Sequence, residues 1–176
     1  MPNPYAMTTV RNARSEEHST IGQLMVAAYS ALPGFPSPAD MPGYYQMLAQ
    51  VGLLTEKPEV EILVAVDSEG TLAGALVYFG DMSHYGTAST ATLQTRAAGF
   101  RLLAVEASCQ GQGVGRQLAE ACIAKARHSG KTSLIIHTTA YMQTAQRLYQ
   151  RMGFVRHEPY DFTQNGIHVM ALVFSL

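Results

Sequence analysis

Three glycines in alternate positions, Gly111, Gly113 and Gly115, lie just before a run of strong helix formers. They belong to the stretch QGQGVGRQLAE, residues 110–120. Glycine weakens regular structure by up to about 1 kcal/mol relative to alanine, so this cluster indicates a special backbone requirement. A tight turn that packs a helix closely on a strand would be one such requirement. A loop whose backbone N–H groups surround a phosphate at the positive end of a helix would be another.

The spacing of the glycines excludes two familiar phosphate-binding loops. A P-loop requires Gly-Lys-Ser/Thr, but Gly115 is followed by Arg116 and Gln117. The dinucleotide fingerprint requires GxGxxG, and no third glycine follows Gly113 and Gly115 at that spacing. From these residues alone, the tight turn and a phosphate site of another kind both stay open.

Tyr149 is the second residue whose type could do chemistry. It falls on the apolar face of an expected helix, together with Ala145 and Leu148. A phenol can act as a general acid in a cleft, but most tyrosines on such a face belong to the core. Taken without context, the pattern favours a core position.

The cysteines and histidines indicate no metal or thiol chemistry. Cys109 and Cys122 are too few for a disulfide framework or a cysteine-based zinc site. The six histidines show no metal-ligand spacing, so no metal is expected. Cys109 adjoins the glycine stretch, but no His/Asp partner pattern supports a nucleophile, and we interpret it as a bystander.

Composition predicts one globular domain over residues 1–176, because 47% of the residues are hydrophobic. The formal net charge of -1, without a Lys/Arg cluster, argues against a nucleic-acid partner. The first residues lack the pattern of a signal peptide, and no stretch approaches the ~20 apolar residues of a membrane span. These features favour a cytoplasmic protein without a membrane partner.

Hydrophobic periodicity indicates the elements that must position the glycines and Tyr149. Ser15 is expected to cap a first helix whose inward face is Ile21, Leu24, Met25, Ala28 and Leu32. The other expected elements are strands at 8–12, 60–66, 71–79, 100–105 and 133–137, helices at 43–53 and 141–152, a helix after the glycines that ends at Gly130, a loop at 80–98 and a final hairpin around Asn165-Gly166. The strand–helix–strand unit over 100–137 requires a parallel pair, whereas the hairpins require antiparallel pairs. The chain is therefore predicted to be α/β, with a mixed sheet and helices on both faces.

Two spaced motifs carry a resemblance to a known family. Residues 110–115 fit the pattern Q/R-x-x-G-x-G/A, and residues 145–154, AQRLYQRMGF, fit A-x-x-L-Y-x-x-x-G-F. One helix and one strand separate the motifs, and LLAV precedes the first. The chain resembles the GNAT superfamily of N-acetyltransferases, most strongly over residues 100–155. The resemblance implies the family's fold, a central, mostly antiparallel sheet whose fourth and fifth strands splay apart.

The same resemblance implies a binding site for acetyl-CoA between the splayed strands. The backbone of the fourth strand would pair with the pantetheine arm, and the backbone amides of the glycine loop would hold the pyrophosphate. Arg116 would add a charge-assisted contact, or is a solvated surface cation. Met142 stands where the family commonly has asparagine, which removes one polar contact to the arm. The cofactor-binding residues implied are Leu103, Ala104, Val105, Gln110, Gly111, Gln112, Gly113, Val114, Gly115, Arg116, Met142, Ala145 and Tyr149.

The activity implied is acetyl transfer to an amine by direct attack in a ternary complex. With the family match, Tyr149 becomes the expected general acid that protonates the departing thiolate. The backbone N–H of Val105 would stabilise the developing oxyanion. Glu106 and His137 are candidates for the base that deprotonates the amine. A water chain would also serve, and Glu106 could equally be an exposed loop carboxylate, so the base stays open.

The acceptor would lie between residues 32–48 and 80–99, which are rich in aromatic residues (Phe35, Tyr44, Tyr45, Tyr85) and contain only two carboxylates (Asp40, Asp81). A polycationic acceptor would be expected to meet a more acidic wall. The sequence therefore favours a primary amine of a small molecule, an amino acid or a peptide N-terminus. The alternative is a non-catalytic acetyl-CoA binding or sensing domain with the same fold. Dimers are common in the family, so a homodimer is one assembly that the resemblance allows.

Overall fold

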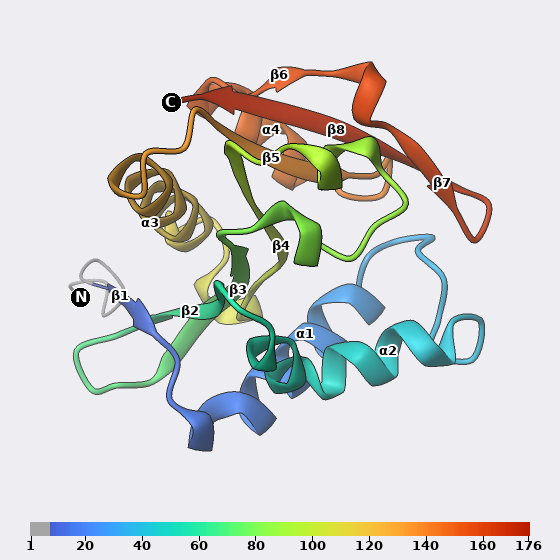
Figure 1. The fold of residues 1–176 in the computed structure, drawn as a ribbon. Helices are drawn as coiled ribbons and strands as arrows, with labels where there is room; N and C mark the ends of the chain where they lie inside the picture. Colours follow the sequence, from blue (N-terminus) through green and yellow to red (C-terminus); the bar gives the residue numbers. More distant parts are fainter. Residues whose placement is uncertain (1–7) are drawn as a thin grey trace.

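The computed structural model describes residues 8–176, and the first seven residues of the predicted domain lie outside this range. One mixed sheet runs in the order β1-β2-β3-β4-β5-β8-β6, and β7 pairs with β8 (Figure 1). Its strands are β1 (Thr9–Asn12), β2 (Val60–Val66), β3 (Leu72–Phe79), β4 (Ala97–Val105), β5 (Ser133–Thr138), β6 (Val155–Arg156), β7 (Phe162–Gln164) and β8 (Ile167–Ser175). The helices are α1 (His18–Ser30), α2 (Pro42–Ala49), α3 (Val114–His128) and α4 (Gln143–Met152).

The predicted element order is confirmed with one addition, the two-residue strand β6. β4 begins at Ala97 rather than at residue 100, because the parallel pairing with β5 starts there. The helix expected over 43–53 is α2 followed by a 3-10 turn over Val51–Glu56. α4 starts two residues later than predicted, since Met142 has a non-helical backbone and forms its N-cap.

The start of the first helix was predicted wrongly. Ser15 does not cap it, because Ser15–Glu17 forms a separate 3-10 turn and α1 begins at His18. The Glu17 carboxylate accepts a 2.7 Å hydrogen bond from the backbone N–H of Arg14, which satisfies a donor at the start of this turn. α1 ends at Ser30, so Leu32 lies beyond this helix. Tyr29 is buried on the inward face of α1 instead.

Two apolar cores lie on opposite faces of the sheet. α1 and α2 cover one face, where Ile21, Met25 and Leu48 pack on Ile62, Val64 and Val77. α3 and α4 belong to the other face, where Leu118, Cys122 and Tyr149 pack with Leu63, Leu76 and Phe100 (Figure 1). β2 and β3 are buried along almost their whole length, as expected for central strands rich in branched residues.

A bulge in β4 exchanges the faces to which its side chains point. Before the bulge, Phe100 packs in the α3/α4 core; after it, Ala104 packs in the α1/α2 core. Regular alternation would put both on one face. The backbone of Leu102 has φ 61°, and the register against β3 shifts at this point. An extra residue in one strand produces this reversal.

β4 and β5 diverge as the family resemblance predicted. They form the parallel pair of the sheet, but their pairing is confined to Ala97–Gly99 against Ser133–Ile135. Beyond these residues β5 continues to pair with β8 on its other side, through His137 and Thr138. Among residues 8–176, the second half of β4 therefore has an edge without a neighbouring strand.

Candidate active site

The open edge of β4 presents the backbone groups of Leu103 and Val105. The N–H of Glu106 donates to the carbonyl of Ala73 on the β3 side, at 2.9 Å. Successive residues of a strand direct their backbone groups to opposite neighbours. Val105 and Leu103 consequently direct theirs away from β3, toward the gap left by β5. Ala104, between them, pairs with Ala75 on β3.

The glycine stretch forms the turn between β4 and α3. Gly111 and Gly113 both have a left-handed backbone, with φ 75° and 83°, and Gly113 is the N-cap of α3. Gln117 is the first residue here whose backbone N–H is bonded, to Gly113 O at 3.0 Å. Within the described chain, the N–H groups of residues 110–116 have no hydrogen-bond acceptor. They include Gln110, Gly111, Gln112, Val114, Gly115 and Arg116.

Close helix packing does not explain all of these glycines. A Cβ on Gly74 of β3 would lie 2.9 Å from the Val114 side chain, so that glycine does allow α3 to approach the sheet. A Cβ on Gly111 or Gly113, in contrast, would meet no atom within 4 Å. A Cβ on Gly115 would make only ordinary contacts, 3.4 Å from Leu148 and 3.5 Å from Leu103. The turn thus combines tight packing at α3 with backbone N–H groups that have no acceptor within the described chain.

Two long side chains flank the turn. Arg116 is more than half exposed, and its Nε donates to Glu120 at 2.8 Å. Gln112 folds back on the turn, because its Nε2 donates to Ser108 O at 2.9 Å. The Oε1 atom of Gln112 is buried without a partner.

The Tyr149 ring is packed between aromatic rings, and the residue is 5% exposed. Its ring centroid lies 5.7 Å from that of Phe100 and 5.6 Å from that of Phe154. The hydroxyl donates to no atom of residues 8–176, yet it is not among the unpartnered oxygens sealed from solvent, which include Tyr78 Oη. Burial of the ring raises the pKa of Tyr149 above its usual value, so the phenol stays protonated.

The remaining predicted residues are distributed between two regions. Glu106 is half-buried beside the glycine turn and lines no described cavity. Cys109 is 1% exposed, consistent with a bystander. Met142, at the N-cap of α4, borders a cavity on the α1/α2 side, whereas Ala145 packs against the α3/α4 core.

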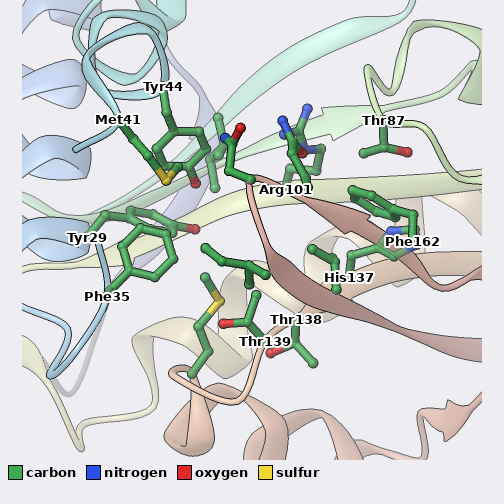
Figure 2. A pocket seen from close by; sticks show the side chains of 16 residues that line it. Tyr29, Phe35, Met41, Tyr44, Thr87, Arg101, His137, Thr138, Thr139 and Phe162 are labelled. Carbon is green, nitrogen blue, oxygen red and sulfur yellow. The ribbon is translucent and has the colours of Figure 1, made fainter. Parts of the chain in front are cut away.

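That cavity, of about 100 Å³, lies where β4 and β5 diverge (Figure 2). A second, of about 330 Å³, shares Tyr44, Arg101, Gln164 and Asn165 with the first. Lining the first cavity are Tyr29, Phe35, Met41, Tyr44, Thr87, Arg101, Leu102, His137, Thr138, Thr139, Met142, Phe162, Gln164, Asn165, Ile167 and Val169. Within residues 8–176 no group of His, Cys, Asp and Glu side chains could hold a metal ion.

The predicted acceptor loops supply part of these walls. Phe35 and Tyr44 line the first cavity, and Tyr85 lines the second. Tyr45 does not, because it is buried in the core and its hydroxyl donates to Pro36 O at 2.8 Å. The carboxylates of Asp40 and Asp81 are also outside the walls, each accepting hydrogen bonds from the local turn.

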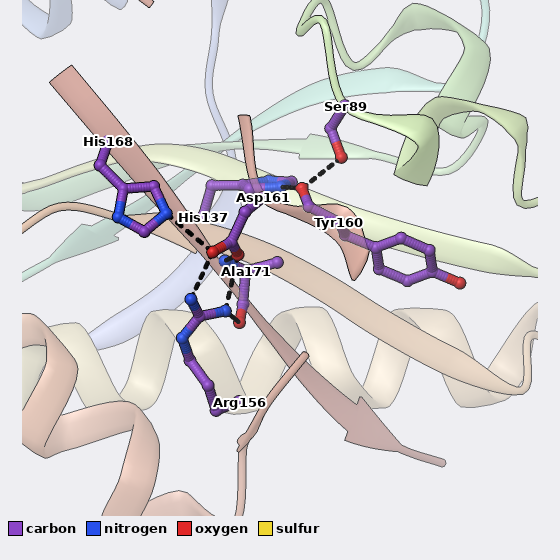
Figure 3. Close-up of polar contacts among 7 residues, drawn as sticks. All are labelled: Ser89, His137, Arg156, Tyr160, Asp161, His168 and Ala171. Atoms are coloured by element: carbon purple, nitrogen blue, oxygen red, sulfur yellow. Dashed lines mark hydrogen bonds and ion pairs between the residues drawn. The ribbon is translucent and has the colours of Figure 1, made fainter. Parts of the chain in front are cut away.

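The sequence prediction missed one whole wall, the hairpin of β7 and β8. Asp161 anchors it by accepting bonds from Arg156, His168 and the backbone N–H of Ala171 (Figure 3). Burial alone would raise the pKa of Asp161, but these three donors outweigh it and lower the pKa to about 2. The preceding Tyr160 carbonyl accepts bonds from Ser89 at 2.5 Å and from His137 at 2.9 Å. An Asn-Gly turn indicated the hairpin, but no local signal indicated where it would dock.

The architecture defines the class of protein as an acyl-CoA N-acyltransferase fold. A GCN5-related N-acetyltransferase from Kribbella flavida is 20% identical over 99% of this chain and 100% of its own, with a TM-score of 0.71. The protein yncA from Salmonella typhimurium, solved with its cofactor acetyl-CoA, is 18% identical over 96% and 94%, with a TM-score of 0.64. The spermidine/spermine N-acetyltransferase SpeG from Vibrio cholerae, solved with manganese ions, is 16% identical over 98% and 95%, also at 0.64.

The family follows from the sequence match. Residues 22–154 match the Acetyltransferase (GNAT) family, and the chain belongs to that family. The resemblance drawn from residues 110–115 and 145–154 is therefore confirmed. No curated protein matches this chain. In the described part of the chain no helix is both long and apolar enough to cross a membrane.

Proposed function

We propose that this protein transfers the acetyl group of acetyl-CoA to a primary amine by direct attack. The observation that carries the proposal is the set of unused backbone groups at the open edge of β4 and in the turn before α3, two consecutive segments of the chain. Leu103 and Val105 offer backbone groups for a pantetheine arm, and the amides of residues 110–116 offer donors for a pyrophosphate. A single anion contact at a helix end contributes about 0.3–1 kcal/mol, so binding would depend on several amides together.

The chemistry requires one proton donor and one oxyanion donor from the chain. The nitrogen lone pair of the acceptor forms the new C–N bond as the C–S bond breaks. Val105 N–H would donate to the carbonyl oxygen as negative charge develops on it. Tyr149, kept protonated by its buried ring, would donate its proton to the departing sulfur.

The acceptor would enter through the cavities on the α1/α2 side. They lie on the opposite face of β4 from Tyr149, so acceptor and coenzyme would meet at the strand from its two sides. Glu106 lies outside these cavities, which does not support a role as the base. We propose instead that the amine loses its proton to water before attack.

The test is release of the coenzyme A thiol with a panel of amines, measured alongside acetyl-CoA binding by calorimetry. We expect turnover with at least one small amine and a loss of turnover in Tyr149→Phe. If acetyl-CoA binds but no amine is acetylated, and Tyr149→Phe binds acetyl-CoA as the wild type does, the enzymatic proposal is overturned in favour of a binding or sensing domain.

A further inference from the structure

Arg101 carries an uncompensated charge into both cavities of the acceptor side. It precedes the β4 bulge and lies between the aromatic cluster of Tyr29, Phe35 and Tyr44 and the pair His137 and Phe162 (Figure 2). Its Nη1 donates to the Tyr85 carbonyl at 2.8 Å, and its Cζ lies 5.6 Å from the centre of the Tyr85 ring. A guanidinium has five N–H donors, and the other four have no acceptor among residues 8–176.

The residues around Arg101 bring no negative charge. Among residues 8–176, the walls of the two cavities contain the exposed Lys57 and the half-buried His84, but neither Asp nor Glu. Asp81 lies 3.9 Å from His84, outside the walls. A guanidinium in a partly desolvated site is stabilised by an anion and repels a second cation. The acceptor side is therefore suited to a ligand with a negative group.

The rest of the first cavity supplies an apolar wall. Tyr29, Phe35 and Tyr44 pack edge to face, with ring centroids about 6 Å apart. Thr138, at the end of β5, also lines the cavity, but its hydroxyl is sealed from solvent and has no partner among residues 8–176. The wall opposite Arg101 is therefore suited to an apolar group of the ligand.

We propose that the acceptor is an amino acid with an apolar side chain, whose carboxylate is bound by Arg101. The aromatic wall of Tyr29, Phe35 and Tyr44 contacts the side chain of the amino acid. This inference rests on the proposed function and narrows its acceptor. It excludes polyamines, which would meet a positive wall, and it excludes peptide N-termini, which lack an adjacent carboxylate.

The test compares three chemical forms of each of three amino acids. Leucine, methionine and phenylalanine are assayed as free amino acids, as carboxamides that imitate a peptide N-terminus, and as decarboxylated amines. We expect Arg101→Gln to lower kcat/KM about 10- to 100-fold for the free amino acids, the range for loss of a charged hydrogen bond. The same variant should stay within about twofold of wild type for the decarboxylated amines. Taking the ratio of variant to wild type for each acceptor removes differences in amine pKa.

Matched variants separate the site from the fold. Arg96→Gln removes an exposed cation one residue before β4. It should leave kcat/KM unchanged for every acceptor. Arg101→Lys keeps the positive charge but lacks the planar guanidinium that binds a carboxylate through two hydrogen bonds. It should therefore recover part of the kcat/KM that Arg101→Gln loses. Acetyl-CoA affinity should be unchanged in Arg101→Gln, which reports that β4 is intact.

Three outcomes decide the matter. An equal loss for all three acceptor forms in Arg101→Gln overturns the proposal while acetyl transfer itself stands. Arg101-dependent binding of amino acids in calorimetry without turnover supports the site and overturns the enzymatic function. No binding of any free amino acid to the protein saturated with coenzyme A overturns the proposal.

Discussion

The hydroxyl of Tyr85 lies 3.1 Å from Nδ1 of His137, and the other ring nitrogen lies 2.9 Å from the Tyr160 carbonyl. A carbonyl can only accept, so Nε2 carries the proton. Burial lowers the pKa of His137, which favours the neutral ring, so Nδ1 is the acceptor in this pair; the Tyr85 hydroxyl shares its one proton between Nδ1 and the Phe100 carbonyl, which lies 3.3 Å away. Both nitrogens are engaged, and His137 has no free lone pair for an acceptor amine.

The first prediction concerns the dependence of rate on pH. Without an enzyme base in the cavity, kcat/KM should rise tenfold per pH unit until the acceptor amine is deprotonated. The inflection should then move with the acceptor, from about 8 for an α-amine of a carboxamide to about 10 for an alkylamine. Profiles with two such amines measure this. An identical inflection for both would show that a group of the protein is titrating.

The second prediction concerns Tyr149. Tyr149→Phe should lower kcat about 10- to 100-fold and leave acetyl-CoA affinity within about twofold, because only proton donation is lost. Thiolate is a tolerable leaving group, which keeps the loss near the lower end of general acid effects. Tyr78→Phe is the control, since it removes a hydroxyl from the same core that is sealed and unpartnered. Equal activity of the two variants would contradict the role of Tyr149.

The third prediction compares Gly111→Ala with Gly113→Ala. Both changes place a Cβ on a left-handed residue in open space, so both should destabilise the fold similarly, by about 1–2 kcal/mol. Of these two glycines, only Gly113, the N-cap of α3, occupies a glycine position of the family motif. Acetyl-CoA affinity measured by calorimetry should fall at least tenfold in Gly113→Ala and much less in Gly111→Ala. Equal affinities would argue against a pyrophosphate at the turn.

The fourth prediction concerns the stability of the β7–β8 hairpin. The pKa of Asp161, about 2, lies below the unfolded value near 3.9, so its stabilisation is complete above pH 4 and is lost as the pH falls toward 2. Asp161→Asn should lower the free energy of unfolding at pH 7 by about 2 kcal/mol. Urea denaturation at several pH values should show the difference from wild type shrinking below pH 4. A difference that is constant from pH 7 to pH 3 would contradict this assignment.

Local patterns predicted most of the fold because they act within a few residues. The helix-ending Gly153, the Asn165-Gly166 turn and the β-branched strands all occur where they were expected. The start of α1 was wrong because Glu17, rather than Ser15, accepts the hydrogen bond from the turn's first donor. A capping preference says which residues can cap, not which of two neighbours does.

The candidate site was less predictable, because its acceptor half is made by contacts distant in sequence. Arg101 follows four residues of β4 and belongs to no motif, and its direction into the cavity depends on which sheet face α1 and α2 cover. The β7–β8 hairpin reaches this wall through Asp161 and Tyr160, whose partners include Ser89 and His137. The glycine turn could be predicted, because the residues that give it a left-handed backbone are adjacent in the sequence.

The bulge at Leu102 divides β4 into two halves whose side chains alternate in opposite phase. Because the extra residue reverses the alternation, Arg101 and Leu102 face the α1/α2 side while Leu103 and Val105 turn toward α3 and α4. Deletion of this one residue would exchange the α1/α2 side and the α3/α4 side for the remaining residues of β4. Substitutions before the bulge could change the acceptor side of β4 while the positions of Leu103 and Val105, after the bulge, are preserved. Acceptor specificity could in this way change through substitutions at Arg101, while the half of β4 proposed to bind the coenzyme is unchanged.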